Sequence, residues 1–156
     1  MRFLQDHPHL LEIAYQGVEK LLAPFQPWLV PGGWTERFFI NLELVSKGPL
    51  FDCRMCGQCV LHNTGMTCPM TCPKNLRNGP CGGVRLDGTC EIKPEMLCIW
   101  VQAWERSTAM KSDGAQIMVI QSPLNNQLKG TSAWINELNA GVQVQPKGWN
   151  AKDWQV

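Results

Sequence analysis

Residues 53–98 read CRMCGQCVLHNTGMTCPMTCPKNLRNGPCGGVRLDGTCEIKPEMLC, and this segment contains every cysteine of the 156-residue chain. The eight thiols belong to Cys53, Cys56, Cys59, Cys68, Cys72, Cys81, Cys90 and Cys98. Glycine and proline recur between them, and large apolar side chains are few. Hydrophobic burial alone therefore cannot offset the entropy of ordering this backbone. Metal–thiolate bonds are the usual means by which such a module folds.

The number of cysteines predicts two metal sites, because four thiolates satisfy either a 4Fe–4S cluster or a structural zinc ion. Cys53, Cys56 and Cys59 follow one another at the spacing typical of ferredoxin loops, in which a distant fourth cysteine completes the cluster. The Cys–Pro steps at Cys68 and Cys72 also occur in such loops. Zinc sites more often show two paired C-x2-C knuckles. The spacing favours two 4Fe–4S clusters and leaves open one or two zinc ions, or one centre of each kind. It does not show which four cysteines share a site.

Other chemistry in this segment is disfavoured. A disulfide framework would need an oxidising compartment, and the N-terminus does not read as a secretion signal. Eight cysteines already complete two sites, so His62 is expected at the surface or beside the ligands. The run from Asn78 to Gly83 resembles a phosphate loop but carries Cys81 in its middle, which predicts a turn that presents a ligand. We expect no catalytic residue, because the thiols are committed as ligands.

The composition excludes several classes of partner. The net charge is +1, so no basic field for nucleic acid is expected. The most apolar stretch, residues 21–30, is too short to span a bilayer and contains two prolines. We therefore expect a cytoplasmic protein without membrane segments. The seven tryptophans either fill a core or mark a surface for a protein partner.

Two helices are predicted before the cysteine segment. The first begins near Asp6–Pro8 and ends before Pro24. Its apolar stripe consists of Leu10, Leu11, Ala14, Tyr15, Val18, Leu21 and Leu22. The second begins after Thr35 as N-cap and ends at Gly48–Pro49. Its apolar positions are Phe38, Phe39, Leu42 and Val45.

A third helix is predicted from Lys93–Pro94 onward, with Cys98 on it. Beyond it, residues 116–121 are strand-like, and a short helix is expected after Ser132. Trp149 and Trp154 lie in sequence that reads as extended, so we infer that this tail lies on another surface, of this protein or of a partner.

The expected fold is thus a small, α-rich, irregular module that metal stabilises. Residues 1–50 form a helical arm, and residues 51–110 form the cysteine-rich metal or iron–sulfur module with its closing helix. Residues 111–156 form an extended tail that binds a partner. The chain has no glycine-rich phosphate loop between a strand and a helix, and it is too short for a barrel.

Four stretches resemble a known family: FDCRMCGQC, CPMTCPKNLRNGPCGG, GTCEIKPEMLCIW and PLNNQLKGTSAWIN. They are similar to the cysteine-rich small subunit, or C-terminal-type domain, found with methylenetetrahydrofolate reductases of acetogens and some other bacteria. The resemblance covers about residues 35–138. It implies that all eight cysteines are ligands.

The resemblance also implies a partner. The catalytic subunit of the family is a TIM-barrel flavoprotein with FMN or FAD, here expected as a separate chain. The small subunit either relays electrons to the flavin, from a donor such as a ferredoxin-type protein, or holds a structural zinc without a redox role. A stand-alone ferredoxin-like carrier is a further alternative, against which the long segments outside the cysteine region argue.

Overall fold

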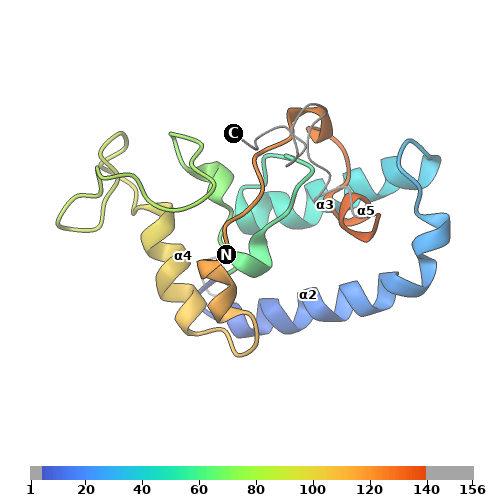
Figure 1. Ribbon diagram of the computed structural model, residues 1–156, viewed down its shortest axis with the longest axis horizontal. Coiled ribbons are helices and arrows are strands. Elements are labelled where there is room, and N and C mark those ends of the chain that lie inside the picture. The colour runs from blue at the N-terminus through green and yellow to red at the C-terminus, as the bar shows by residue number, and fades with distance from the viewer. Residues whose placement is uncertain (1–4, 140–156) are drawn as a thin grey trace, which may run out of the picture.

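A computed structural model of the protein describes residues 5–139, and the chain in this range is mainly helical (Figure 1). The α-helices are α2 (Pro8–Leu22), α3 (Trp34–Phe51), α4 (Ile99–Thr108) and α5 (Ala133–Leu138). The 3-10 helices are η1 (Ala23–Trp28), η2 (Leu61–Asn63), η3 (Pro69–Thr71), η4 (Gly114–Met118) and η5 (Asn126–Leu128). Strand pairing among the described residues is limited to two isolated bridges, Val84 with Cys90 and Thr89 with Leu97. The prediction of an α-rich, irregular fold is confirmed.

The helical arm consists of α2 and α3, which run in opposite directions and are joined by η1 (Figure 1). Pro8 is the first residue of α2, where its missing N–H costs no helical hydrogen bond. Pro24 and Pro27 lie in η1, so the first helix ends as predicted. Its apolar stripe is only partly covered, because Tyr15 is buried whereas Leu21 is 65% exposed.

The second helix differs from its prediction at both ends and on its buried face. Gly33, not Thr35, is the N-cap of α3, and the helix continues past Gly48 to Phe51. Pro49 lies in its last turn, where the missing N–H costs one helical hydrogen bond. The predicted apolar positions Phe38, Leu42 and Val45 are exposed.

The buried face of α3 is instead polar and consists of Glu36, Glu43 and Lys47. The two carboxylates accept hydrogen bonds from the start of α5: Glu36 from the Ser132 N–H at 3.4 Å and Glu43 from the Ser132 hydroxyl at 2.6 Å. Burial of these groups is possible because each charge has partners.

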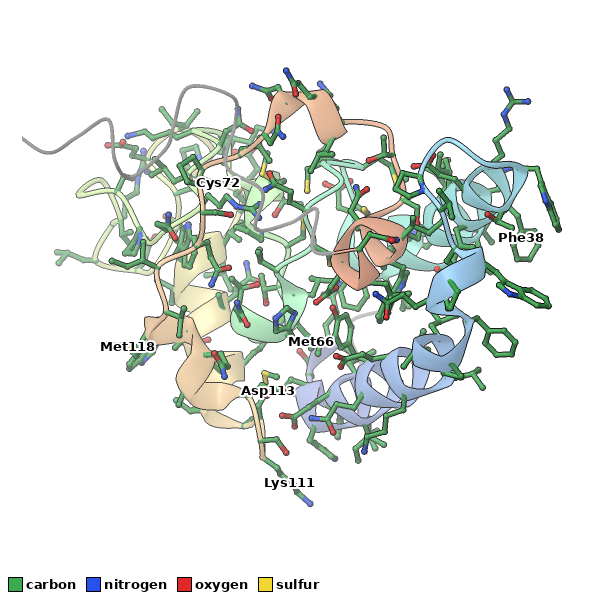
Figure 2. All side chains as sticks on the ribbon, turned by 45° about the vertical axis from the view of Figure 1, so that its right-hand side comes forward. Phe38, Met66, Cys72, Lys111, Asp113 and Met118 are labelled. Carbon is green, nitrogen blue, oxygen red and sulfur yellow. The ribbon has the colours of Figure 1, made fainter. Side chains whose placement is uncertain are left out.

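The hydrophobic core joins the arm, the cysteine segment and the tail. It consists of Tyr15, Leu61, Met66, Met110 and Trp134, and Figure 2 shows Met66 in the interior. The rings of Tyr15 and Trp134 are 4.6 Å apart, and the Tyr15 hydroxyl donates to Glu137 at 2.7 Å. The tail up to residue 139 therefore packs against the rest of this chain.

The segments after the cysteines differ from the prediction in part. Helix α4 begins at Ile99, so Cys98 is its N-cap residue and does not lie on it. Residues 93–97 instead take part in a turn and in the bridge that pairs Leu97. Residues 116–121 do not form the expected strand, because η4 (Gly114–Met118) takes up their first half, whereas α5 begins after Ser132 as predicted. Trp149 and Trp154 lie outside the described residues.

Glu12 ties α2 to the loop after α4. Its carboxylate accepts hydrogen bonds from the backbone N–H groups of Lys111, Ser112 and Asp113 at 2.9, 2.8 and 2.7 Å. Burial alone would raise the pKa of Glu12, but these three donors outweigh it and lower the pKa. Figure 2 shows Lys111 and Asp113 beside the N-terminal end of α2.

Candidate metal centre

The structure sorts the eight cysteines into two groups of four, each around its own small cavity. The first group is Cys53, Cys56, Cys59 and Cys68. The second group is Cys72, Cys81, Cys90 and Cys98. All eight thiols are free. Two tetrads of soft thiol donors are what two four-coordinate metal centres require.

Three cysteines of the first group follow α3 directly, where the backbone repeatedly takes left-handed conformations. Asp52, Met55 and Gly57 have φ values of 50°, 47° and 74°. A side chain on Gly57 would collide with the backbone oxygen of Leu128. The Gly57 carbonyl oxygen accepts a hydrogen bond from Asn136 Nδ2 at 2.8 Å. The Cys56–Cys59 loop is therefore enclosed by η5 and α5, far along the sequence.

Burial dominates the electrostatics of the first group. It raises the pKa of the Cys59 thiol to about 11 and that of Cys68 to about 12. Two buried cations, Lys47 and Arg77, line the same cavity. Burial by itself would lower the pKa of Lys47, but Cys59 and Glu43 outweigh it and raise the pKa.

The second group is held by loops. The Cys90 N–H donates to the Met96 carbonyl at 3.0 Å, and the Cys98 N–H donates to Gly88 at 2.8 Å. The Trp100 indole donates to the Leu76 carbonyl at 3.1 Å, which anchors the loop after Cys72 to α4.

The Cys81 thiol of this second group differs from the buried thiols of the first. The Gly83 N–H and the nearby Lys74 ammonium lower its pKa. Lys74 also forms an ion pair with Glu91, and both residues line the cavity. Charged side chains thus stand at the rim of the second cavity, whereas those of the first are buried.

A single turn connects the two groups. Cys68 of the first group precedes η3, and Cys72 of the second group follows it. The Cys72 N–H donates to the Pro69 carbonyl at 3.0 Å, and the Thr71 hydroxyl donates to the Cys68 carbonyl at 2.7 Å. Four residues span at most about 14 Å even when fully extended, and this turn is folded. The two cavities are therefore neighbours.

Residues 33–127 match the family model described as methylene-tetrahydrofolate reductase C terminal. The chain belongs to this family. The match covers more than half of the chain and includes all eight cysteines, which confirms the resemblance noted in the sequence. No curated protein and no solved structure matches the chain.

The chemistry of the donors around each cavity, four thiols, is that of a metal–thiolate centre. Within residues 5–139, no three Cys, His, Asp or Glu side chains converge closely enough to hold one ion, so the thiols surround each cavity without meeting at a point. Arg77 supplies an independent indication. It is 8% exposed, its Nη2 donates to the Gln58 carbonyl at 2.9 Å, and its Nε and Nη1 atoms are buried without a partner among the described residues. Four thiolates or sulfides in the cavity would supply the missing acceptors.

His62 is placed apart from the cysteines. Its ring packs on Tyr15, 5.4 Å between ring centres, and it lines neither cysteine cavity.

The reasoning from sequence missed Lys47 and Arg77. Lys47 follows Glu43 by four residues, which predicts an ion pair on one helix face but not its burial. No local pattern distinguishes Arg77 from a surface arginine.

The described helices include none that is both long and apolar enough for a membrane span.

Proposed function

We propose that this chain is a non-catalytic accessory subunit of a cytoplasmic methylenetetrahydrofolate reductase complex. In this proposal it relays electrons through two 4Fe–4S clusters to the FMN or FAD of a separate TIM-barrel subunit. The observation that carries the proposal is the sorting of eight cysteines, four and four, around two neighbouring cavities. When bound, each cluster would carry one electron at a time between a ferredoxin-type donor and the flavin.

The residues of the chain would have distinct tasks. The four thiols of each group would hold one cluster, and η3 would keep the two clusters close. Lys47 and Arg77, which are themselves buried, would offset the negative charge of the first centre. The Cys56–Cys59 loop would be held in place by Asn136, whose amide also donates to Thr131 at 2.7 Å.

The helical arm supplies a surface suited to the catalytic subunit. Its exposed apolar side chains include Leu21, Phe25, Trp28, Trp34, Phe38 and Val45, here called the apolar arm surface. Trp28 is 78% exposed and Trp34 is 83% exposed. Figure 2 shows Phe38 pointing away from the body of the protein. Aromatic residues are enriched in the centres of lasting protein interfaces, which supports the arm as the docking site.

Zinc at one or both sites is the alternative. The enclosed position of the first group between α3 and α5 favours it, since a metal without a redox role could join these elements there. A stand-alone ferredoxin-like carrier is less well supported. Such a carrier needs only a small docking face, whereas this chain exposes the apolar arm surface as well.

Metal analysis of the anaerobically purified complex with its flavin-dependent subunit tests the proposal. About eight irons and eight inorganic sulfides per chain, with broad visible absorption, are expected for two cubane clusters. One or two zinc ions, no iron or inorganic sulfide, and a visible spectrum of the flavin alone would overturn the electron relay in favour of the structural alternative. Iron-containing protein that never associates with a reductase subunit would favour the carrier.

A further inference from the structure

A third, open hollow of about 580 Å³ lies where the two groups of cysteines approach the surface. Its lining includes Cys56 of the first group and Cys72 of the second. Met70 and Thr71 of η3, the turn that connects the groups, line it as well. Cys72 is labelled in Figure 2. One cysteine of each group therefore lines the same solvent-accessible hollow.

The side chains around this hollow are cationic. Arg54, Lys93 and Lys129 line it, and no aspartate or glutamate does. These cations come from three separate segments: the Cys53–Cys56 loop, the turn before α4 and the turn after η5. We call this site the basic hollow.

The charge of the basic hollow is not cancelled by its neighbours. Arg54 forms an exposed ion pair with Asp52 at 2.7 Å, which offsets part of its charge. Lys93 and Lys129 are exposed, and within residues 5–139 neither takes part in an ion pair. A chain of net charge +1 therefore concentrates at least two uncompensated positive charges at one concave site.

We propose that the basic hollow is the docking site of an acidic one-electron carrier protein, which delivers electrons next to Cys56 and Cys72. The proposal rests on the proposed function, because it needs a redox centre behind the hollow. In the transfer the carrier is oxidised by one electron and the centre is reduced by one electron. No covalent bond forms or breaks.

The charge of the basic hollow and the apolarity of the arm surface indicate which partner binds at each. Electron carriers form small, short-lived complexes in which opposite charges raise the rate of encounter. The basic hollow has this character. A lasting subunit interface is more apolar, as the apolar arm surface is. In Figure 2, Phe38 of that surface lies at the right-hand edge of the molecule and Cys72 lies toward its upper left, so the two surfaces are separate.

The double variant Lys93→Glu/Lys129→Glu tests the assignment in the intact complex. The probe is a reduced, acidic ferredoxin-type protein, and the readout is the rate of bleaching of the cluster absorption. At low ionic strength the second-order rate constant should fall about tenfold, and the difference should shrink as salt is added. Reduction by dithionite, a small reagent that does not need a protein docking site, should keep the wild-type rate.

The matched control is Lys20→Glu/Lys111→Glu, which changes the net charge equally at exposed positions outside the hollow. It should leave the rate near that of the wild type. An equal slowing by both double variants would overturn the proposal, because net charge alone would then explain the effect. Loss of the flavin subunit from Lys93→Glu/Lys129→Glu, with unchanged carrier kinetics, would also overturn it and make the hollow a subunit interface.

Iron content separates this inference from the proposed function. Wild-type complex without iron means that the electron relay itself is wrong. Wild-type complex with about eight irons, whose reduction is insensitive to the Lys93 and Lys129 substitutions, means that only the docking site is wrong. Equal iron content and equal visible spectra of wild type and variants show that the substitutions left the clusters intact. Lys93→Ala/Lys129→Ala, which removes charge without reversing it, should show a smaller decrease of the same sign.

Discussion

Glu43 of α3 accepts a hydrogen bond from the Ser132 hydroxyl at 2.6 Å, although the two residues are 89 positions apart. The same carboxylate accepts from the Trp134 N–H at 3.1 Å and pairs with Lys47 at 3.1 Å. Glu43 thus connects three features: the helical arm, the start of α5 and a cation beside the first cysteine group. All of these groups are buried.

Replacing Glu43 by glutamine should destabilise the protein strongly. The substitution leaves the Lys47 ammonium buried without its counter-ion, and losing one partner of a buried pair costs roughly 3–5 kcal/mol. The free energy of unfolding of the metal-loaded protein, measured with denaturant, should fall by about this amount. Glu105→Gln, at an exposed position of α4, is the control and should change it by less than about 0.5 kcal/mol. Similar values for both variants would contradict the role of Glu43.

Pairs of cysteine substitutions should reveal the two groups. Cys56→Ser/Cys68→Ser removes two ligands of the first group and should lose about half of the metal, because one centre remains. Cys56→Ser/Cys90→Ser removes one ligand of each group and should lose nearly all of it. Metal content per chain after anaerobic purification is the measurement. If the two double variants retain equal amounts of metal, the grouping by cavity is wrong.

The arm and the short helix after Ser132 were predictable from local signals. Proline at the start of α2, proline in η1 and serine before α5 act within a few residues. The buried face of α3 was not predictable in this way. Its apolar residues follow the helical period, but the carboxylates of Glu36 and Glu43 find partners about 90 residues away. Tertiary hydrogen bonds, which sequence periodicity does not report, decided which face is buried.

The candidate site was predictable in its ligands but not in their grouping. Eight cysteines in 46 residues indicate two tetrads on count alone. The division between Cys68 and Cys72, only four residues apart, depends on how η3 turns the chain. Cys81, Cys90 and Cys98 join Cys72 because backbone bonds among residues 85–98 fold the loop back on itself. The spacing of the cysteines along the sequence does not predict these contacts.

Replacing Glu12 by glutamine should reduce the stability at neutral pH and flatten its acid dependence. The folded-state pKa of Glu12 lies below its ordinary value of 4.5, so its contribution is complete above that pH and is lost as the pH falls through the lower folded value. Hydrogen bonds to a charged acceptor contribute about 1.5–3 kcal/mol, and glutamine keeps only part of this. Unfolding midpoints between pH 7 and pH 3.5 measure the difference between wild type and variant.

That difference should be largest near pH 7 and shrink below pH 4.5. Comparing the two proteins removes the effect of Glu137, whose pKa burial raises and which therefore acts in the opposite direction. The control Glu19→Gln, at an exposed position of the same helix, should leave the acid dependence as in the wild type. A difference that stays constant with pH would mean that the Glu12 charge is not involved.

Replacing Gly57 by alanine should impair both folding and metal retention. Its φ of 74° is unfavourable for alanine, and the added Cβ would collide with the Leu128 backbone oxygen and with Thr131 Oγ1 at 2.8 Å. Relief requires η5 to move away from the Cys56–Cys59 loop. We expect a loss of stability of at least 2 kcal/mol, which is roughly the combined cost of backbone strain and overpacking.

The control for Gly57 is Gly17→Ala. Gly17 lies within α2, and a Cβ there meets nothing within 4 Å. Alanine should therefore stabilise the helix by about 0.5–1 kcal/mol. Thermal unfolding and metal content of both variants decide the matter, and an unaffected Gly57→Ala would show that the loop is not packed as described.

Arg77 should affect the reduction potential of the first centre but not that of the second. Its buried guanidinium lines the first cavity, with two N–H groups free to donate to thiolate or sulfide. Arg77→Met removes the positive charge while filling a similar space. Because reduction adds negative charge to a cluster, the loss of a buried cation should make reduction harder and shift the midpoint potential of one cluster to a more negative value.

The conservative variant Arg77→Lys separates charge from shape. It retains the cation and should return the potential most of the way to the wild-type value, whereas a purely structural role would leave both variants equally altered. Arg85→Met, at an exposed position near the second group, is the control and should leave the first cluster unchanged. Redox titrations followed by electron paramagnetic resonance resolve the two clusters. If Arg77→Met shifts neither potential while iron content is retained, the guanidinium does not face a redox centre.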